Sequence, residues 1–143
     1  MKVIRPIVGL FFLGTAAYLG RLAYEGDGEL SEIEYFTPKI NDQSEVFFRA
    51  KNIEGKRGIY LVKGEHLLRL IGEGDAVDTD LGAAKILWNK FYPGFSGEID
   101  VNNNGDIVFH ALLVASDTER EIGSGIFYLE RKKIDENTDL NQE

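Results

Sequence analysis

The sequence predicts an all-β protein that contains two copies of one hairpin unit, preceded by a hydrophobic N-terminal helix. Residues 40–50 match residues 101–111 at an offset of 61, and residues 57–61 match residues 124–128 at an offset of 67. Apolar residues alternate through both copies, as they do in strands that bury one face. A chain of 143 residues without cysteine can bury one core without disulfides or structural metals.

Residues 1–24 are predicted to be a signal peptide or a membrane anchor. Two basic residues precede the uncharged run Pro6–Gly20, which is the order found in export signals. A membrane-spanning helix needs about 20 apolar residues, and residues 3–24 reach this length only if Arg21 extends to the lipid headgroups. A cleaved signal, an uncleaved anchor and an ordinary buried helix therefore stay open. The first two place the C-terminal body outside the cytoplasm, because basic residues precede the run and acidic residues follow it.

The net charge of −8 is unevenly distributed along the chain. The first 24 residues carry +3, so the remainder carries −11. A body this acidic repels phosphate backbones, and we therefore expect no nucleic-acid partner. Residues 135–143 are predicted to form an acidic, disordered tail.

Each copy has the pattern of a β-hairpin. A turn rich in asparagine precedes a strand with alternating apolar residues, a loop follows, and a glycine begins the next strand. The first copy adds a third strand, whereas the second copy lacks one. The predicted strands are Val46–Ala50, Gly58–Val62 and Leu67–Ile71 in the first copy, and Ile107–Ala111 and Gly125–Glu130 in the second.

The pattern is less regular around these strands. A loop is expected at Leu112–Ser124, and Ala83–Asn89 fits either a helical turn or an extended segment. Phe91–Ile99 fits a strand that leads into the second copy, as Ile33–Lys39 does in the first. The β-repeat domain is predicted to span residues 25–134, with units at about residues 33–82 and 92–134.

The two copies resemble a family of exported bacterial tandem β-repeat proteins, many of which have no assigned function. The family unit has the pattern Asn-x-x-Gly-x-Val-x-Phe-x-Ala followed by Gly-Ile-Phe, and Ser44 stands here in place of its glycine. The resemblance covers about residues 33–130 and implies propeller-blade-like antiparallel units without catalytic residues. It rests on Asn41–Ala50, Gly58–Tyr60, Leu67–Ile71 and Gly72–Asp75 in the first copy, and on Asn102–Ala111 and Gly125–Phe127 in the second.

Two such units are too few to close a ring, because propellers typically have about four to eight blades. The open strand edges that remain would invite partners. We therefore expect self-association, docking onto a larger complex, or a compact two-unit sandwich or curved sheet.

Two acidic stretches could be mistaken for metal sites. Asp100–Ile107 matches the first eight positions of a calcium loop, but the loop's final acid would fall at Ala111, and Lys39 occupies the first position in the other copy. We interpret this stretch as a strand–turn–strand corner. Asp75, Asp78 and Asp80 form a weak alternative cation site, although such a run is more often a solvated loop. No cofactor is predicted.

The sequence does not predict an enzyme. His66 or His110 could be combined with Ser96 or Ser124 into a catalytic triad on paper, but only geometry defines a triad. Both histidines are interpreted as residues of polar faces.

Aromatic residues gather between the two copies, at Trp88, Phe91, Tyr92 and Phe95. Such a cluster could stack on sugars or contact a protein, although burial in the core is more common. Trp88, Tyr92 and Phe95 are therefore the candidate binding residues.

The sequence predicts a non-enzymatic, exported or membrane-anchored module for protein–protein binding. For such a module we expect a role as an accessory subunit of a membrane assembly. A carbohydrate-binding, lectin-like oligomer is the alternative.

Overall fold

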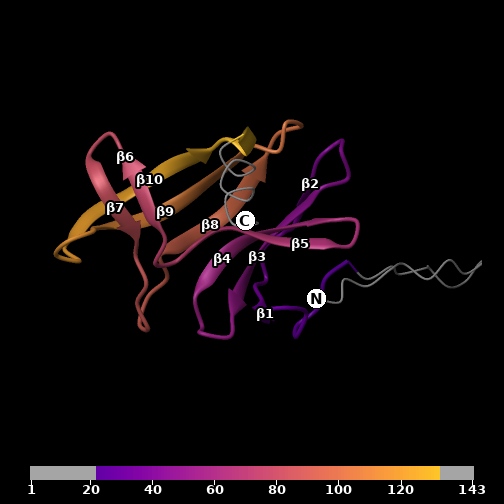
Figure 1. The fold of residues 1–143 in the computed structure, drawn as a ribbon, viewed down its shortest axis with the longest axis horizontal. Helices are drawn as coiled ribbons and strands as arrows, with labels where there is room; N and C mark the ends of the chain where they lie inside the picture. Colours follow the sequence, from indigo (N-terminus) through magenta and orange to yellow (C-terminus); the bar gives the residue numbers. More distant parts are fainter. Residues whose placement is uncertain (1–21, 133–143) are drawn as a thin grey trace, which may run out of the picture.

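The computed structural model describes residues 22–132, where every regular element is a β-strand and the strands form two antiparallel sheets (Figure 1). The first sheet has the order β1-β3-β4-β5, with β2 also paired to β3, and the second has the order β10-β9-β7-β6, with β8 also paired to β9. The first-sheet strands are β1 (Leu30–Ile33), β2 (Lys39–Ile40), β3 (Val46–Asn52), β4 (Arg57–Lys63) and β5 (His66–Gly72). The second-sheet strands are β6 (Ala76–Thr79), β7 (Gly82–Ile86), β8 (Phe95–Val101), β9 (Ile107–Ala115) and β10 (Glu121–Leu129).

The predicted all-β fold with two antiparallel repeats is confirmed. Ala50 pairs with Gly58 across β3 and β4, and the equivalent Ala111 pairs with Gly125 across β9 and β10. β2 and the end of β8 also occupy equivalent places, since Ile40 pairs with Val46 and Val101 pairs with the equivalent Ile107. The helix predicted within residues 1–24 falls largely outside the described residues, and the predicted tail falls wholly outside them.

The structure extends two segments that the sequence left as loops. β9 continues to Ala115 and β10 begins at Glu121, so most of the loop expected at Leu112–Ser124 is a longer hairpin. The acidic stretch after Gly72 contains strand β6, and the ambiguous segment that follows contains β7. These short strands form because β6 pairs with β7, which in turn pairs with the C-terminal end of β9.

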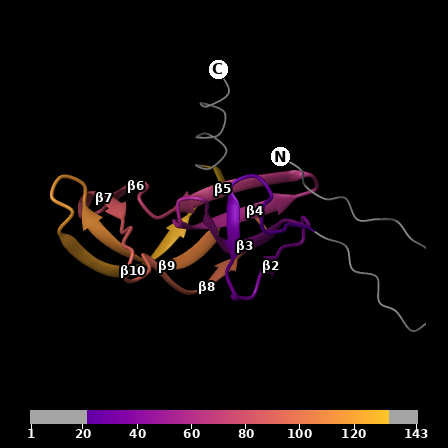
Figure 2. The ribbon, with the colours of Figure 1, turned by 90° about the horizontal axis from the view of Figure 1, so that it is seen from below.

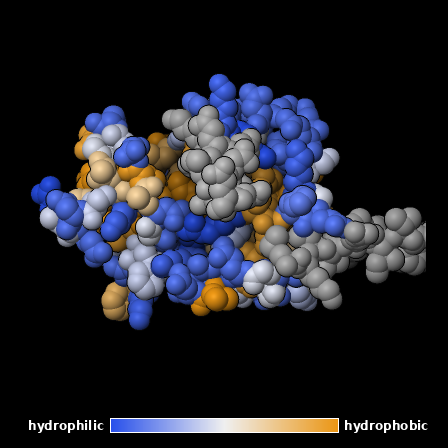
Figure 3. Space-filling model, in the orientation of Figure 1, coloured by the Kyte–Doolittle hydropathy of each residue, from blue (hydrophilic) through white to orange (hydrophobic). Residues whose placement is uncertain are grey.

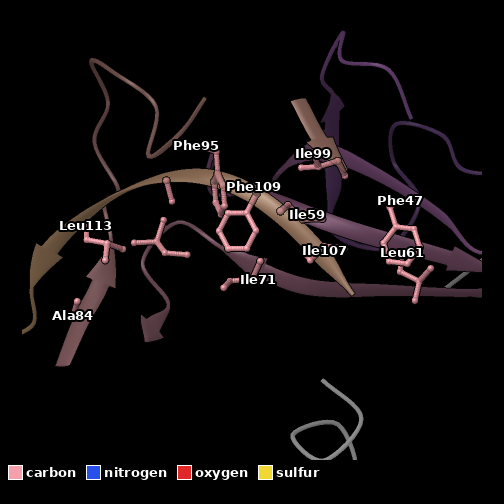
Figure 4. Close-up of a cluster of buried hydrophobic side chains, with 12 residues drawn as sticks. Phe47, Ile59, Leu61, Ile71, Ala84, Phe95, Ile99, Ile107, Phe109 and Leu113 are labelled. Atoms are coloured by element: carbon pink, nitrogen blue, oxygen red, sulfur yellow. The ribbon is translucent and has the colours of Figure 1, made fainter. Parts of the chain in front are cut away.

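The main core lies where the two sheets face each other (Figure 4). Phe47, Ile59 and Leu61 of the first sheet are fully buried there against side chains of the second sheet, Phe109 among them. Burying each such side chain contributes about 1.5–3 kcal/mol. The remaining buried members of the cluster are Ile71, Ala84, Ile86, Phe95, Ile99, Ile107, Ala111 and Leu113.

The two units pack head to tail. We call the positions of Phe48, Ala50 and Tyr60, with their equivalents in the second sheet, the forward face. We call the positions of Phe47, Ile59 and Leu61, with their equivalents, the back face. The back face of the first sheet packs on the forward face of the second, whose members are Phe109, Ala111 and Phe127.

The forward face of the first sheet belongs to a second cluster, where it packs with Leu30. Phe48 and Phe109 therefore both lie in buried clusters, each with 5% of its surface exposed, but they lie in different clusters. The first sheet buries both of its faces. The alternation in its sequence predicted only one buried face.

Glu73 joins the two units in the interior. Its side chain is 1% exposed, and its carboxylate accepts hydrogen bonds from the backbone N–H of Gly94 at 2.7 Å and of Arg57 at 2.8 Å. Gly94 also lies against the backbone of Leu87, so a Cβ at this position would collide with the Leu87 carbonyl oxygen. The link between the sheets therefore requires glycine at residue 94.

We predict that Gly94→Ala lowers the free energy of unfolding by about 2–3 kcal/mol, because backbone must move to admit the methyl group. Gly64→Ala is the control, since Gly64 has a φ of 59° but open space around its Cα. Its cost is about 1 kcal/mol from backbone strain alone. Denaturant unfolding measures both variants. Equal losses would contradict the steric role of Gly94.

Candidate functional site

The second sheet ends in the edge strand β10. In the first sheet β4 lies between β3 and β5, whereas among the described strands the equivalent β10 pairs only with β9. Within residues 22–132 no counterpart of β5 covers its other side. β10 therefore presents a nine-residue edge with free backbone hydrogen-bonding groups.

The exposed positions of β10 are apolar. Ile126 and Tyr128 are 70% and 57% exposed, whereas the equivalent Ile59 and Leu61 of β4 are fully buried. Residues 122–129 carry no charge, although protein edge strands usually carry charges or prolines that prevent pairing. A β-bulge near Gly123 is the one such device on this strand. The edge has the composition of a strand that is normally covered.

A groove of about 700 Å³ is lined by residues of β5, β6, β7, β9 and β10. Its apolar lining includes Leu70 and Val77 from one side and Phe127 and Leu129 from β10. Polar residues, including Arg69, Asp75, Asp78 and Glu130, line other parts of the groove. Figure 3 shows apolar surface over this region of β6, β9 and β10. Apolar side chains on one face of an added strand would fit here.

Arg69 and Asp75 form a fixed ion pair in the groove. The Arg69 guanidinium donates to both Asp75 carboxylate oxygens at 2.9 Å, and Asp75 also accepts from the N–H of Gly72 at 2.8 Å. Burial disfavours the charged guanidinium, but the hydrogen bonds and charge of Asp75 outweigh this and raise the pKa of Arg69. The carboxylate of Asp75 is therefore committed to an internal contact.

The weak alternative cation site does not assemble around that carboxylate. Asp78 lies on β6 and Asp80 follows that strand. Across residues 22–132 no three acidic or histidine side chains come together in a metal-binding group.

The calcium-like stretch forms a turn, as the sequence interpretation proposed. The Asn102 side-chain oxygen accepts from the N–H groups of Asn104 and Asp106 at 3.0 Å, and Gly105 has a φ of 83°. Asn41 makes the same two contacts in the first unit, where Ser44 has a φ of 59°. The side-chain oxygens of Asn41 and Asn102 therefore accept hydrogen bonds from the backbone of their own turns.

These two turns touch each other. Asn103 donates its side-chain N–H to the Asp42 carboxylate, and its side-chain oxygen accepts from the Asp42 N–H at 3.2 Å. Gln43 donates to the Asn103 carbonyl at 2.8 Å. Equivalent turns of successive units thus lie side by side.

Glu45 connects the end of β10 to the first unit. Its carboxylate is 2% exposed and contacts Asn41 at 2.9 Å, Lys63 at 3.1 Å and Arg131 at 3.2 Å. Burial raises the pKa of Glu45. The hydrogen bonds from Asn41 and Lys63 and the charge of Arg131 together lower this pKa by more than burial raises it, so the net shift is downward. The ionised form is stabilised in the folded state.

We predict that Glu45→Gln lowers stability by about 2 kcal/mol at neutral pH, because hydrogen bonds to a charged group are lost. A lowered pKa stabilises the fold fully above the ordinary value of 4.5, and this stabilisation is lost as the pH falls through the folded-state pKa. The difference between wild type and variant should therefore shrink in acid. Thermal unfolding between pH 3 and 7 measures it.

Glu54→Gln is the matched control, since Glu54 pairs with Lys56 at the surface. Its effect should stay within about 0.5 kcal/mol across that range. A pH-independent loss in Glu45→Gln would show that ionisation of Glu45 does not stabilise the fold.

One histidine and one serine considered for catalysis do meet. Ser96 Oγ lies 2.5 Å from His110 Nδ1 across β8 and β9. In the part of the chain that the structure describes, no carboxylate contacts His110, and His66 and Ser124 lie on β5 and β10. The arrangement is a polar cross-strand pair without a third catalytic member.

The aromatic residues divide between core and surface. Phe95 is 1% exposed and packs on Phe109 with ring centroids 5.6 Å apart. Trp88 and Tyr92 are 43% and 50% exposed, and the Lys56 ammonium lies 5.3 Å from the Trp88 ring centroid. Two of the three candidate binding residues are thus accessible to a ligand, and the third supports the core.

No protein-family model, curated protein or solved structure significantly matches this chain. Within residues 22–132 the structure has no helix with the length and apolarity that a membrane crossing needs. The functional evidence therefore lies in the geometry of the two sheets. The missing third strand of the second copy was the sequence signal for the β10 edge.

Proposed function

We propose that this chain is a non-enzymatic module that binds an extended strand of a protein at β10. The unpaired, uncharged edge of β10 carries the proposal. Strand addition recognises a partner through backbone hydrogen bonds, and pockets for alternate side chains add selectivity. The groove beside β10 supplies such a pocket.

The first sheet provides the pattern for the bound strand. β5 runs antiparallel to β4, with Leu67 opposite Val62 and Gly72 opposite Gly58. Leu67 packs in the second cluster, while Leu68 packs against the main core. A strand with apolar residues on both faces, in antiparallel orientation, would complete the second sheet in the same way.

We further propose that the units are propeller-blade-like. In support, the back face of one unit packs on the forward face of the next, and the equivalent turns of both units touch. Two units do not close a ring, so the last strand position of the second unit is open to another chain.

The proposed location is the outer side of a membrane, reached through residues 3–24 acting as an anchor or a cleaved signal. The support is the order of charged and apolar residues in that segment. The acidic body argues for a protein partner over a nucleic acid.

We predict that a labelled peptide of residues 64–73, which contains β5, binds wild type with a saturable rise in fluorescence anisotropy. Ile126→Lys should weaken this binding about tenfold, equivalent to about 1.4 kcal/mol, because a charge on the edge opposes strand pairing.

The matched control is Ile53→Lys, since Ile53 is 79% exposed in the turn between β3 and β4. It should bind the peptide as wild type does. Equal binding by wild type and Ile126→Lys, or no binding by wild type, would contradict strand addition at β10.

Carbohydrate binding is the second candidate, supported by the exposure of Trp88 and Tyr92. Such rings can stack on sugars. If this function holds, Trp88→Ala with Tyr92→Ala should abolish retention on glycan columns and leave the melting temperature nearly unchanged. Phe95→Ala serves as the contrast, since truncating this core ring should cost about 3–5 kcal/mol. Unchanged retention in the double variant would exclude this surface as a sugar site.

A further inference from the structure

We infer that two neighbouring loop tips form a docking site for the surface of a lipid bilayer. The first loop is the turn at residues 53–56, between β3 and β4, and the second is the connection at residues 87–94, between β7 and β8. Both project from the same side of the molecule, the lower side in Figure 1. They share no residue with the β10 edge, so docking there goes beyond strand addition.

The two loops lie against each other and are held in shape. The Lys56 ammonium of the first loop lies 5.3 Å from the Trp88 ring centroid of the second, within the reach of a cation–π contact. The side-chain oxygen of Asn52 accepts from two backbone N–H groups of the first loop at 3.0 Å. The side-chain oxygen of Asn89 accepts from the N–H of Phe91 at 2.7 Å. The two tips are therefore positioned together before any ligand arrives.

The most exposed side chains of these loops are also the most apolar. Ile53 and Phe91 are 79% and 91% exposed and have no polar side-chain atom. Tyr92 and Trp88, whose rings carry a polar group, are less exposed, at 50% and 43%. A bilayer takes apolar side chains into its hydrocarbon and holds tyrosine and tryptophan at the headgroups. The loops present their side chains in this order.

The charge of the loops favours contact with lipid phosphates. Residues 81–97 contain two lysines and no acid, although the chain has 24 acidic residues. The two loops together hold Lys56, Lys90 and Glu54, so their net charge is 2 − 1 = +1. Glu54 is paired with Lys56 at 3.0 Å. Lysine can lay its methylene stem along an apolar surface while its ammonium group reaches the headgroups. The loops are thus a part of the acidic body that a phosphate-bearing surface can approach.

The fluorescence of Trp88 tests this inference, because Trp88 is the only tryptophan of the chain and residues 1–24 add no signal. The full chain is reconstituted into phosphatidylcholine vesicles with or without bromine on the acyl chains, since bromine quenches a tryptophan that reaches the hydrocarbon. Neutral lipid is used because the acidic body repels an anionic surface. This lipid carries no sugar, so glycan binding cannot produce the signal. We expect brominated lipid to quench Trp88 in wild type.

Phe91→Asp and Ile53→Asp should each lower the ratio of inserted to free loop tips about tenfold, because a charge replaces a side chain that enters the hydrocarbon. Most of the quenching should then disappear. Leu81→Asp is the matched control, since Leu81 is 73% exposed in the β6–β7 turn, which lies on the opposite side of the molecule in Figure 1. It should be quenched as wild type is.

Three results would overturn bilayer docking: no quenching in wild type, quenching that survives both tip substitutions, or an equal loss in Leu81→Asp. Thermal unfolding checks that each variant folds, and either tip variant decides the result if the other unfolds. The residue 64–73 peptide separates this inference from the proposed function. A wild type that binds the peptide but shows no quenching would overturn bilayer docking and leave strand addition intact.

Discussion

The contact between the back face of the first sheet and the forward face of the second is the constraint on which the structure depends. Phe47, Ile59 and Leu61 meet Phe109 and its neighbours there, and these side chains are among the most buried in residues 22–132. Because the two faces differ, the units pack in one direction only. The forward face of the first sheet, which packs with Leu30, therefore lies at one end of the pair. The back face of the second sheet lies at the other end.

Polar contacts keep that packing in register. Glu73 holds the backbone at Gly94, and Glu45 holds the end of β10 through Arg131. Arg49, which is 3% exposed, donates to the Gly97 carbonyl of the second sheet at 2.5 Å and to Glu34 at 2.9 Å. A buried charged group that loses its partner costs several kcal/mol. Displacing one sheet from the other would break these contacts, so they oppose such a displacement. Through Arg131, the residue next but one after β10, these contacts hold the end of that strand against the first unit.

The repeated strands could be predicted from the sequence, because the alternation of apolar residues and the turn residues of each hairpin lie close together along the chain. The offsets of 61 and 67 predicted the equivalence of Ala50–Gly58 and Ala111–Gly125, which the registers show. Strand β6 was missed, since Asp78 is typical of a loop, and the segment of β7 was left open between a helical turn and an extended strand. Both strands form through pairing, because β6 pairs with β7 and β7 pairs with β9. The sequence also could not predict that Phe95 is buried while Trp88 is exposed. That difference depends on which side chains face the other sheet.

The meeting of equivalent turns has a consequence for how such a chain can change length. Asn41 and Asn102 hold the same loop, and the two loops contact each other directly. An additional duplicated segment placed after the second unit would find both a turn to touch and a sheet to cover at Val108, Ile126 and Tyr128. Tandem duplication could therefore lengthen the protein without the evolution of a new contact surface, and each added segment would carry the vacant edge to the new terminus.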